Sequence, residues 1–146
     1  MSTSSQASPP RDPGPDLLVV LREDYARFPE NQTYSIYDPQ VYFKDPVNEF
    51  RGLSRYQQMI AWMGRWFRDI RLDLHEIQQT GAQIRTEWTL SWSLPLPWHP
   101  RLQIPGWTEL HINEAGLIGS HIDYWRCSRW DVLGQVFWPR DPSRSR

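Results

Sequence analysis

The period of the hydrophobic pattern changes once along this chain, and that change constrains the fold more than any other feature. From residue 53 to residue 67 the apolar residues recur at the spacing of one helical stripe, at Leu53, Tyr56, Ile60, Met63 and Phe67. Trp62 and Trp66 lie beside this stripe, so we expect the helix to be buried over a broad face. From residue 83 to residue 94 the period falls to two, as in a half-buried strand, and one face carries Ile84, Trp88, Leu90, Trp92 and Leu94.

Similar signals predict the remaining elements. Asp16 is a suitable N-cap for a helix that ends before Pro29, with apolar residues at helical spacing between them. Alternating segments bounded by Gly- and Pro-containing breaks predict strands at residues 41–45, 70–79, 107–113 and 117–125. Residues 128–138 are typical of a short closing helix.

This order, two helices and then four strands with short connections, is that of an α+β domain and not of alternating βαβ units. We expect a curved antiparallel sheet with helices packed over its concave face, enclosing an apolar pocket. A chain of 146 residues has the length of one domain, which we place at residues 16–138. The Ser- and Pro-rich residues 1–15 are expected to be a disordered tail, and residues 139–146 a flexible one.

Charge and composition argue against several classes of function. The 16 Lys and Arg residues nearly balance the 17 Asp and Glu residues, so no global field attracts nucleic acid. No segment approaches the ~20 apolar residues of a transmembrane helix, and the single cysteine, Cys127, suits a reducing compartment. We therefore expect a soluble, cytoplasmic protein. The four histidines have no metal-binding spacing, and we see neither a phosphate loop nor a nucleophile elbow, so we predict neither metal nor cofactor.

Several short sequence motifs follow one another in a characteristic order. Tyr-Asp-Pro at 37–39 leads to Val-Tyr-Phe-Lys-Asp-Pro at 41–46, Phe-Arg-Gly-Leu at 50–53 opens the long helix, and Gly-Leu-Ile at 116–118 precedes His-Ile-Asp-Tyr-Trp at 121–125. In this the chain resembles the SnoaL-like, ketosteroid-isomerase-like superfamily, also called the nuclear-transport-factor-like or cystatin-like cone fold. The resemblance covers residues 17–138 and is greatest to cyanobacterial and plastid proteins of unknown function. The resemblance implies the fold but not the function, because cone folds host isomerases, hydrolases, cyclases, scaffolds and binding modules.

The resemblance also implies which residues line the pocket. The acid that follows the first strand, a general base in the isomerases, corresponds to Asp45, and the tyrosine of the first helix that polarises a carbonyl corresponds to Tyr25. The acid that other cone enzymes carry on the last strand corresponds to Asp123. Where the isomerases carry a second acid this sequence has Thr108, a weaker donor toward an enolate, which argues against the isomerase reaction.

The last strand carries the main candidates for chemistry. Its alternation puts His121, Asp123 and Trp125 on one face, which by the resemblance looks into the cone. His121 and Asp123 would lie ~7 Å apart along the strand, near enough to share a water molecule or a bifunctional ligand and to act as general base and orienter. The alternatives are a polar network closed within the core, or a face turned to solvent. Asp45 has the alternative role of forming a turn before Pro46.

The rest of the expected site is apolar. The candidates for lining it are Trp88, Leu90, Trp92, Thr108, Trp125, Tyr25 and Trp66. Core packing is the alternative role for Trp88, Leu90 and Trp92. Separately, residues 93–107 hold four prolines and predict a long, rigid hairpin tip with exposed apolar groups. Such a tip would contact a protein partner, a membrane surface or a second copy, or would fold back over the mouth of the cone.

Three functions are consistent with these features. The preferred one is a pocket that binds a small apolar or amphipathic molecule without turnover. The second is a protein-interaction or assembly factor that uses the outer sheet face or the 93–107 hairpin. The third is a metal-free acid–base isomerase, hydrolase or cyclase that uses Asp123, His121 and Asp45. Because cone folds often pair through the open sheet face, we also expect a homodimer.

Overall fold

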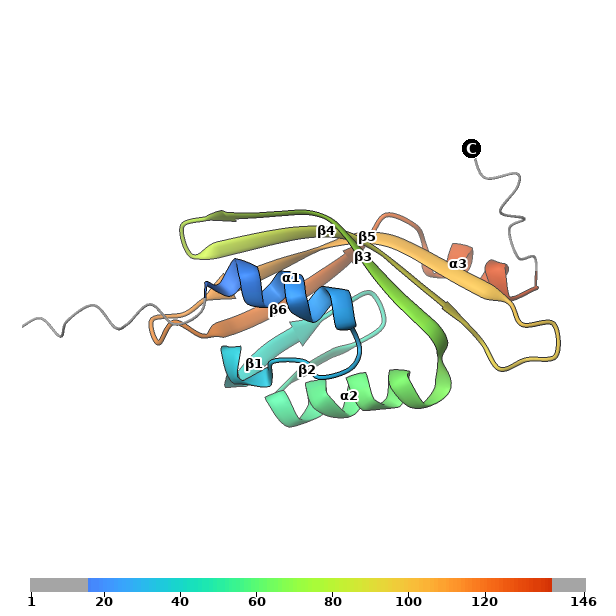
Figure 1. Cartoon of the computed structure of the whole chain (residues 1–146), viewed down its shortest axis with the longest axis horizontal. Helices are drawn as coiled ribbons and strands as arrows, with labels where there is room; N and C mark the ends of the chain where they lie inside the picture. Colours follow the sequence, from blue (N-terminus) through green and yellow to red (C-terminus); the bar gives the residue numbers. More distant parts are fainter. Residues whose placement is uncertain (1–15, 138–146) are drawn as a thin grey trace, which may run out of the picture.

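The computed structural model describes residues 16–137, and the expected tails at residues 1–15 and 139–146 lie outside this range. Three helices, a short 3-10 turn and six strands follow one another along the described chain (Figure 1). In order they are α1 (Leu17–Arg27), the turn Tyr34–Ile36, β1 (Tyr37–Lys44), β2 (Glu49–Arg51), α2 (Leu53–Trp66), β3 (Arg68–Thr80), β4 (Gln83–Ser93), β5 (Arg101–Ile112), β6 (Ile118–Trp125) and α3 (Arg129–Phe137). The fold is the expected α+β cone.

The strands form one mixed sheet in the order β2-β1-β6-β5-β4-β3. Strands β3 to β6 make the expected antiparallel meander. Strand β1, in contrast, pairs in parallel with β6 and places Phe43 beside His121. The prediction of an antiparallel sheet is therefore wrong for this one pair in the described chain, because it joins segments so far apart in the sequence that no local pattern shows it. Strand β2 lies at the edge of the sheet and pairs Phe50 with Phe43.

Helices α1 and α2 lie under the concave face of the sheet (Figure 1). Helix α1 begins as predicted, because the Asp16 carboxylate accepts a hydrogen bond of 3.0 Å from the Leu18 N–H. One core cluster lies between these helices and the sheet and includes the buried residues Leu21, Val41, Phe43, Ile60, Ile84, Leu110 and Ile118. A second cluster, formed by Trp88, Trp92, Leu102 and Ile104, packs against α3 through Val132 and Val136.

Helix α2 is buried over a narrower face than the sequence predicted. Only Tyr56 and Ile60 are buried in it, whereas Trp62 is 55% exposed and Trp66 is 49% exposed. Neither of these two tryptophans belongs to a core cluster. Part of the apolar face that the sequence predicted for this helix is therefore not used for core packing.

The 93–107 segment is not the long hairpin that its prolines predicted. Strand β5 begins at Arg101, so that the loop between β4 and β5 is confined to residues 94–100. Leu102 and Ile104 are buried, since the alternation of the strand outweighs the prolines around it. Pro105 still takes part in the sheet, because its carbonyl accepts a hydrogen bond of 2.8 Å from the Arg126 N–H. Of the exposed apolar groups expected there, Trp98 is 51% exposed.

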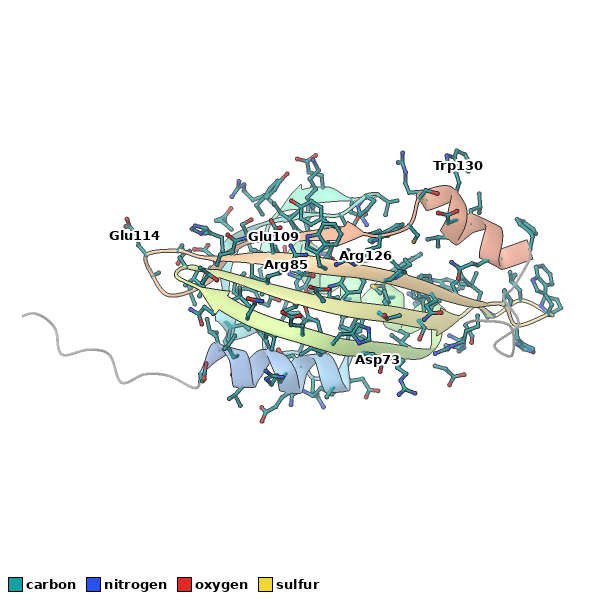
Figure 2. The ribbon with its side chains drawn as sticks, turned by 90° about the horizontal axis from the view of Figure 1, so that it is seen from above. Asp73, Arg85, Glu109, Glu114, Arg126 and Trp130 are labelled. Atoms are coloured by element: carbon teal, nitrogen blue, oxygen red, sulfur yellow. The ribbon has the colours of Figure 1, made fainter. Side chains whose placement is uncertain are left out.

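The outer face of the sheet is polar, and Figure 2 shows Arg85, Glu109 and Arg126 on it. Trp107 lies between two guanidinium groups, with Arg85 at 5.1 Å and Arg126 at 4.7 Å from its ring centroid. Its indole also stacks on the Tyr124 ring at a centroid distance of 4.9 Å. Trp107 is therefore held by its own chain on the face opposite the helices.

Residue 106 in β5 has to be glycine because the side chain of Trp88, its cross-strand neighbour in β4, lies against it. It pairs with Trp88 on one side and with Trp125 on the other. A Cβ atom at residue 106 would lie 2.3 Å from the Tyr124 carbonyl oxygen and 2.7 Å from the Trp88 ring. The missing side chain therefore lets the Trp88 indole lie against β5.

We predict that Gly106→Ala destabilises the fold by about 3 kcal/mol or more, the upper end for overpacking, since a backbone oxygen cannot move aside. Gly134→Ala in α3 is the control, because nothing lies within 4 Å of the added methyl group. Alanine should stabilise that helix by up to about 1 kcal/mol. Urea unfolding of both variants measures the difference. Equal stabilities would contradict the proposed close packing at Gly106.

Candidate functional site

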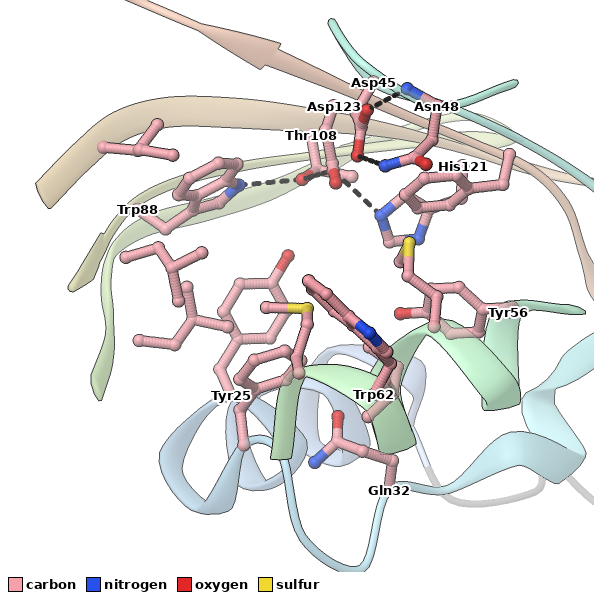
Figure 3. A pocket seen from close by; sticks show the side chains of 18 of the residues that line it. Tyr25, Gln32, Asp45, Asn48, Tyr56, Trp62, Trp88, Thr108, His121 and Asp123 are labelled. Atoms are coloured by element: carbon pink, nitrogen blue, oxygen red, sulfur yellow. Dashed lines mark hydrogen bonds and ion pairs between the residues drawn. The ribbon is translucent and has the colours of Figure 1, made fainter. Parts of the chain in front are cut away.

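A cavity of about 800 Å³ lies between the concave face of the sheet and the helices. Its wall combines both core clusters, so that aromatic and aliphatic side chains from every layer of the fold face it. A few polar groups gather on the side formed by β5 and β6, as Figure 3 shows. A concave, largely apolar space with a small number of convergent polar groups is the usual form of a ligand site.

The polar groups form a hydrogen-bonded series across three adjacent strands. The Trp88 indole N–H in β4 donates to the Thr108 hydroxyl in β5 at 2.7 Å. The Thr108 hydroxyl in turn donates to Asp123 Oδ1 in β6 at 2.5 Å, which the register allows because these two residues are direct cross-strand partners. Both the direction and the position of the Thr108 O–H are thereby determined, and the Asp123 carboxylate is held in place.

His121 contacts the same carboxylate oxygen. Its Nε2 lies 2.8 Å from Asp123 Oδ1, so the two side chains meet directly and not through the intervening water that the strand spacing suggested. His121 is 7% exposed as a residue, and its imidazole lies among the rings of Tyr37, Phe43 and Tyr56, with centroids 4.9 to 6.2 Å away. Since carboxylates accept, Nε2 carries the proton. Nδ1 is buried and has no hydrogen-bond partner among residues 16–137.

Asp45 lies at the same cavity but is also the turn former of the alternative prediction. Its Oδ1 accepts hydrogen bonds from the backbone N–H groups of Val47 at 2.8 Å and Asn48 at 2.6 Å, and its Oδ2 accepts one from the Asn48 amide at 3.2 Å. Burial raises the pKa of Asp45, and the nearby charge of Asp123 adds to this effect. Asp45 therefore shapes the β1–β2 turn and also places a second carboxyl group near Asp123.

Three phenols face this region from the other elements. The Tyr25 hydroxyl of α1 lies 2.8 Å from the Thr86 hydroxyl of β4. Burial raises the pKa of Tyr25, and it likewise raises the pKa values of Tyr37 and Tyr56. All three are therefore neutral hydroxyl groups at physiological pH.

The structure brings most of the predicted site residues together and excludes one. Asp45, His121 and Asp123 line the cavity together with the predicted ligand contacts Trp88, Leu90, Trp92, Thr108, Trp125 and Tyr25. Trp66 does not line it, so that prediction is wrong: one helical turn earlier, Trp62 takes this place. The predicted stripe of the long helix could have identified Tyr56, which the site prediction also missed. Thr86, the hydrogen-bond partner of Tyr25, does not itself line the cavity; it is a polar residue in the apolar alternation of its strand, a signal that the site prediction did not use.

Two further features, a metal-ligand cluster and a membrane-spanning helix, are absent from the residues that the structure describes. Among residues 16–137 no group of three or more His, Cys, Asp or Glu side chains is placed to hold a metal ion. In the same part of the chain, no helix has both the length and the apolar character needed to cross a membrane.

The fold is the nuclear-transport-factor-like cone fold, which this chain shares with several solved structures. A putative SnoaL-like polyketide cyclase from Shewanella denitrificans is 10% identical, covers 85% of this chain and 96% of its own, and gives a TM-score of 0.67. A protein of ketosteroid isomerase-like fold from Catenulispora acidiphila, in complex with trimethylamine, is 15% identical over 83% and 92% of the two chains, with a TM-score of 0.66. An epoxide hydrolase of Mycobacterium tuberculosis is 18% identical over 84% of each chain, with a TM-score of 0.58.

The chain belongs to the family of uncharacterised conserved proteins DUF2358, whose model matches residues 15–121. This match spans the fold from α1 to His121 in β6. No curated protein matches the chain significantly in sequence. At these identities the structural neighbours show the shared fold alone.

The buried phenols lead to a prediction for alkaline conditions. In the unfolded chain tyrosines ionise near their ordinary pKa of 10.0, whereas burial raises the pKa of Tyr25 in the folded protein. Above pH 10 the folded state therefore binds more protons than the unfolded state, and the stability contributed by this difference is complete below pH 10 and lost as the pH rises. Tyr25→Phe should reduce the slope of unfolding free energy against pH by up to about 1.4 kcal/mol per pH unit. Urea unfolding between pH 9 and pH 11.5 tests this, and equal slopes for the two proteins would contradict it.

Proposed function

We propose that this protein binds a small apolar or amphipathic molecule in the cavity between its sheet and its helices. The observation that carries the proposal is the series Trp88–Thr108–Asp123–His121, which presents oriented polar groups at one side of an otherwise apolar space. A cavity of about 800 Å³ is within the size range of ligand sites for small molecules. The trimethylamine complex of the Catenulispora protein supports the use of this fold as a small-molecule receptor.

The energetics of the wall favour an amphipathic ligand. Burying apolar surface against the indole and phenyl rings contributes about 25 cal/mol per Å². A polar group placed against Asp123 replaces water on a carboxylate that is already oriented by two donors, so little reorganisation is needed on binding. The ligand would place its apolar part among the tryptophans and its polar part near β6.

Filling the cavity should prevent binding. Met59 lines the cavity from α2, and Met59→Trp would put an indole into the space. We expect this variant to bind the neutral fluorescent probe N-phenylnaphthylamine at least about tenfold more weakly than the wild type, as a loss of 1.4 kcal/mol or more implies. The measurement is the rise in probe fluorescence on titration with protein.

Gln57→Trp is the matched control, because residue 57 is an exposed position of the same helix and does not line the cavity. This variant should bind the probe as the wild type does. If Met59→Trp retains the wild-type affinity while thermal unfolding shows it to be folded, the probe does not occupy the cavity and the proposal fails.

A second candidate is a metal-free acid–base isomerase, hydrolase or cyclase. It is favoured by the direct contact of His121 with Asp123, which holds a carboxylate and an imidazole in one polar cluster, and by the raised pKa of Asp45 nearby. The polyketide cyclase and epoxide hydrolase neighbours are consistent with this chemistry. If the protein is an enzyme of this kind, Asp123→Asn should abolish turnover. Asp73→Asn is the control and should leave turnover unchanged, because Asp73 does not line the cavity (Figure 2).

Two further expectations also stand as proposals. We propose that the protein is a homodimer. A single species at the monomer mass of 17.4 kDa in sedimentation velocity would contradict this proposal. We also propose that the nearest relatives are cyanobacterial and plastid proteins, which an alignment of family members would test. A protein-interaction role for the 93–107 segment has less support, because β5 incorporates residues 101–107 and only residues 94–100 remain as a loop.

A further inference from the structure

The charged groups that line the cavity are mainly acidic. Asp24, Asp45 and Asp123 contribute carboxylates, whereas Arg55 contributes the one guanidinium group of the lining. Asp24 is balanced by its own ion pair with Arg27 at 2.8 Å, outside the polar cluster. Arg55 is exposed to solvent, so its charge is screened by water. The charge inside the cavity is therefore set by Asp45 and Asp123.

The hydrogen bonds of Asp123 leave part of its carboxylate available. Both Thr108 and His121 meet the same oxygen, Oδ1. The other oxygen accepts no hydrogen bond from any residue between 16 and 137, and the side chain is 19% exposed. A carboxylate that is half satisfied inside a mostly apolar cavity requires a hydrogen-bond donor or a cation from elsewhere.

Aromatic rings surround the space in front of this carboxylate. Figure 3 shows Trp88 on one side, Tyr56 on another, and Tyr25 and Trp62 across the cavity from Asp123. The faces of such rings carry negative electrostatic potential and attract cations, most strongly when water is displaced. A carboxylate among aromatic rings is the arrangement that proteins use to recognise ammonium groups.

We propose that the ligand of this cavity carries a positively charged ammonium group. This group pairs with the Asp123 carboxylate and is surrounded by the aromatic side chains of Tyr25, Tyr56, Trp62 and Trp88. This inference rests on the proposed function and adds the chemical class of the ligand: an amphipathic amine or quaternary ammonium compound. An anionic ligand would meet two carboxyl groups, and among residues 16–137 the cavity lining has no buried guanidinium or ammonium group to offset them. A neutral alcohol would satisfy the free oxygen of Asp123 but would gain nothing from the rings.

Three probes with the same apolar part separate these possibilities: phenylbutylamine, phenylbutanol and phenylbutyrate. We expect isothermal titration calorimetry of the full chain at pH 7 to give affinities in the order amine, alcohol, carboxylate, with the amine at least about tenfold tighter than the alcohol, as for a charge-assisted contact. Asp123→Asn should remove the preference for the amine over the alcohol. An amine that binds no more tightly than the alcohol would overturn the inference but leave the proposed function standing.

Trp62 offers an independent test, since it is 55% exposed and lies outside both core clusters. Trp62→Leu should weaken binding of phenylbutylamine about threefold more than binding of phenylbutanol, as the loss of one cation–π contact implies. Trp66→Leu is the matched control on the same helix, because Trp66 lies outside the cavity, and it should leave both affinities unchanged. Equal losses for both probes in Trp62→Leu would contradict the cation site. Failure of all three probes and of N-phenylnaphthylamine to bind would overturn both proposals.

Discussion

Trp88 can lie against β5 because residue 106 has no side chain, and the polar side of the cavity depends on that placement. With the indole in this position, its N–H reaches the Thr108 hydroxyl, which is left to donate to Asp123. A side chain at residue 106 would displace the ring and leave a buried N–H without an acceptor, at a cost of about 1–3 kcal/mol. A steric feature of β5 thus determines the orientation of a carboxylate in the adjacent strand β6.

The cavity persists because the elements around it are positioned by other contacts. Helices α1 and α2 pack on the cluster around Leu21 and Ile60, while α3 packs on the cluster around Trp92. Each cluster is anchored to a different part of the sheet, so neither α1 and α2 nor α3 can close the space between the clusters without losing their own packing. The polar series on β5 and β6 further opposes collapse, since burying these groups against apolar side chains would remove water without replacing its hydrogen bonds.

The site brings together polar groups in different environments. Burial raises the pKa values of Tyr25, Tyr56 and Asp45, while Asp123 accepts hydrogen bonds from Thr108 and His121. Such an arrangement suits the recognition of a polar group in an apolar environment, and it equally suits acid–base chemistry. The choice between binding and turnover therefore depends on the ligand that reaches Asp123.

The sequence by itself determined which side chains share a face, because the two-residue period of a strand follows from covalent geometry. This is why the inward set of β4 and the pairing of His121 with Asp123 on one face of β6 could be predicted. Only the tertiary structure decided that β1 pairs in parallel with β6, that Trp62 and not Trp66 lines the cavity, and that His121 touches Asp123 directly. Each of these depends on contacts between segments distant in the chain, and a local pattern contains no information about where such segments meet.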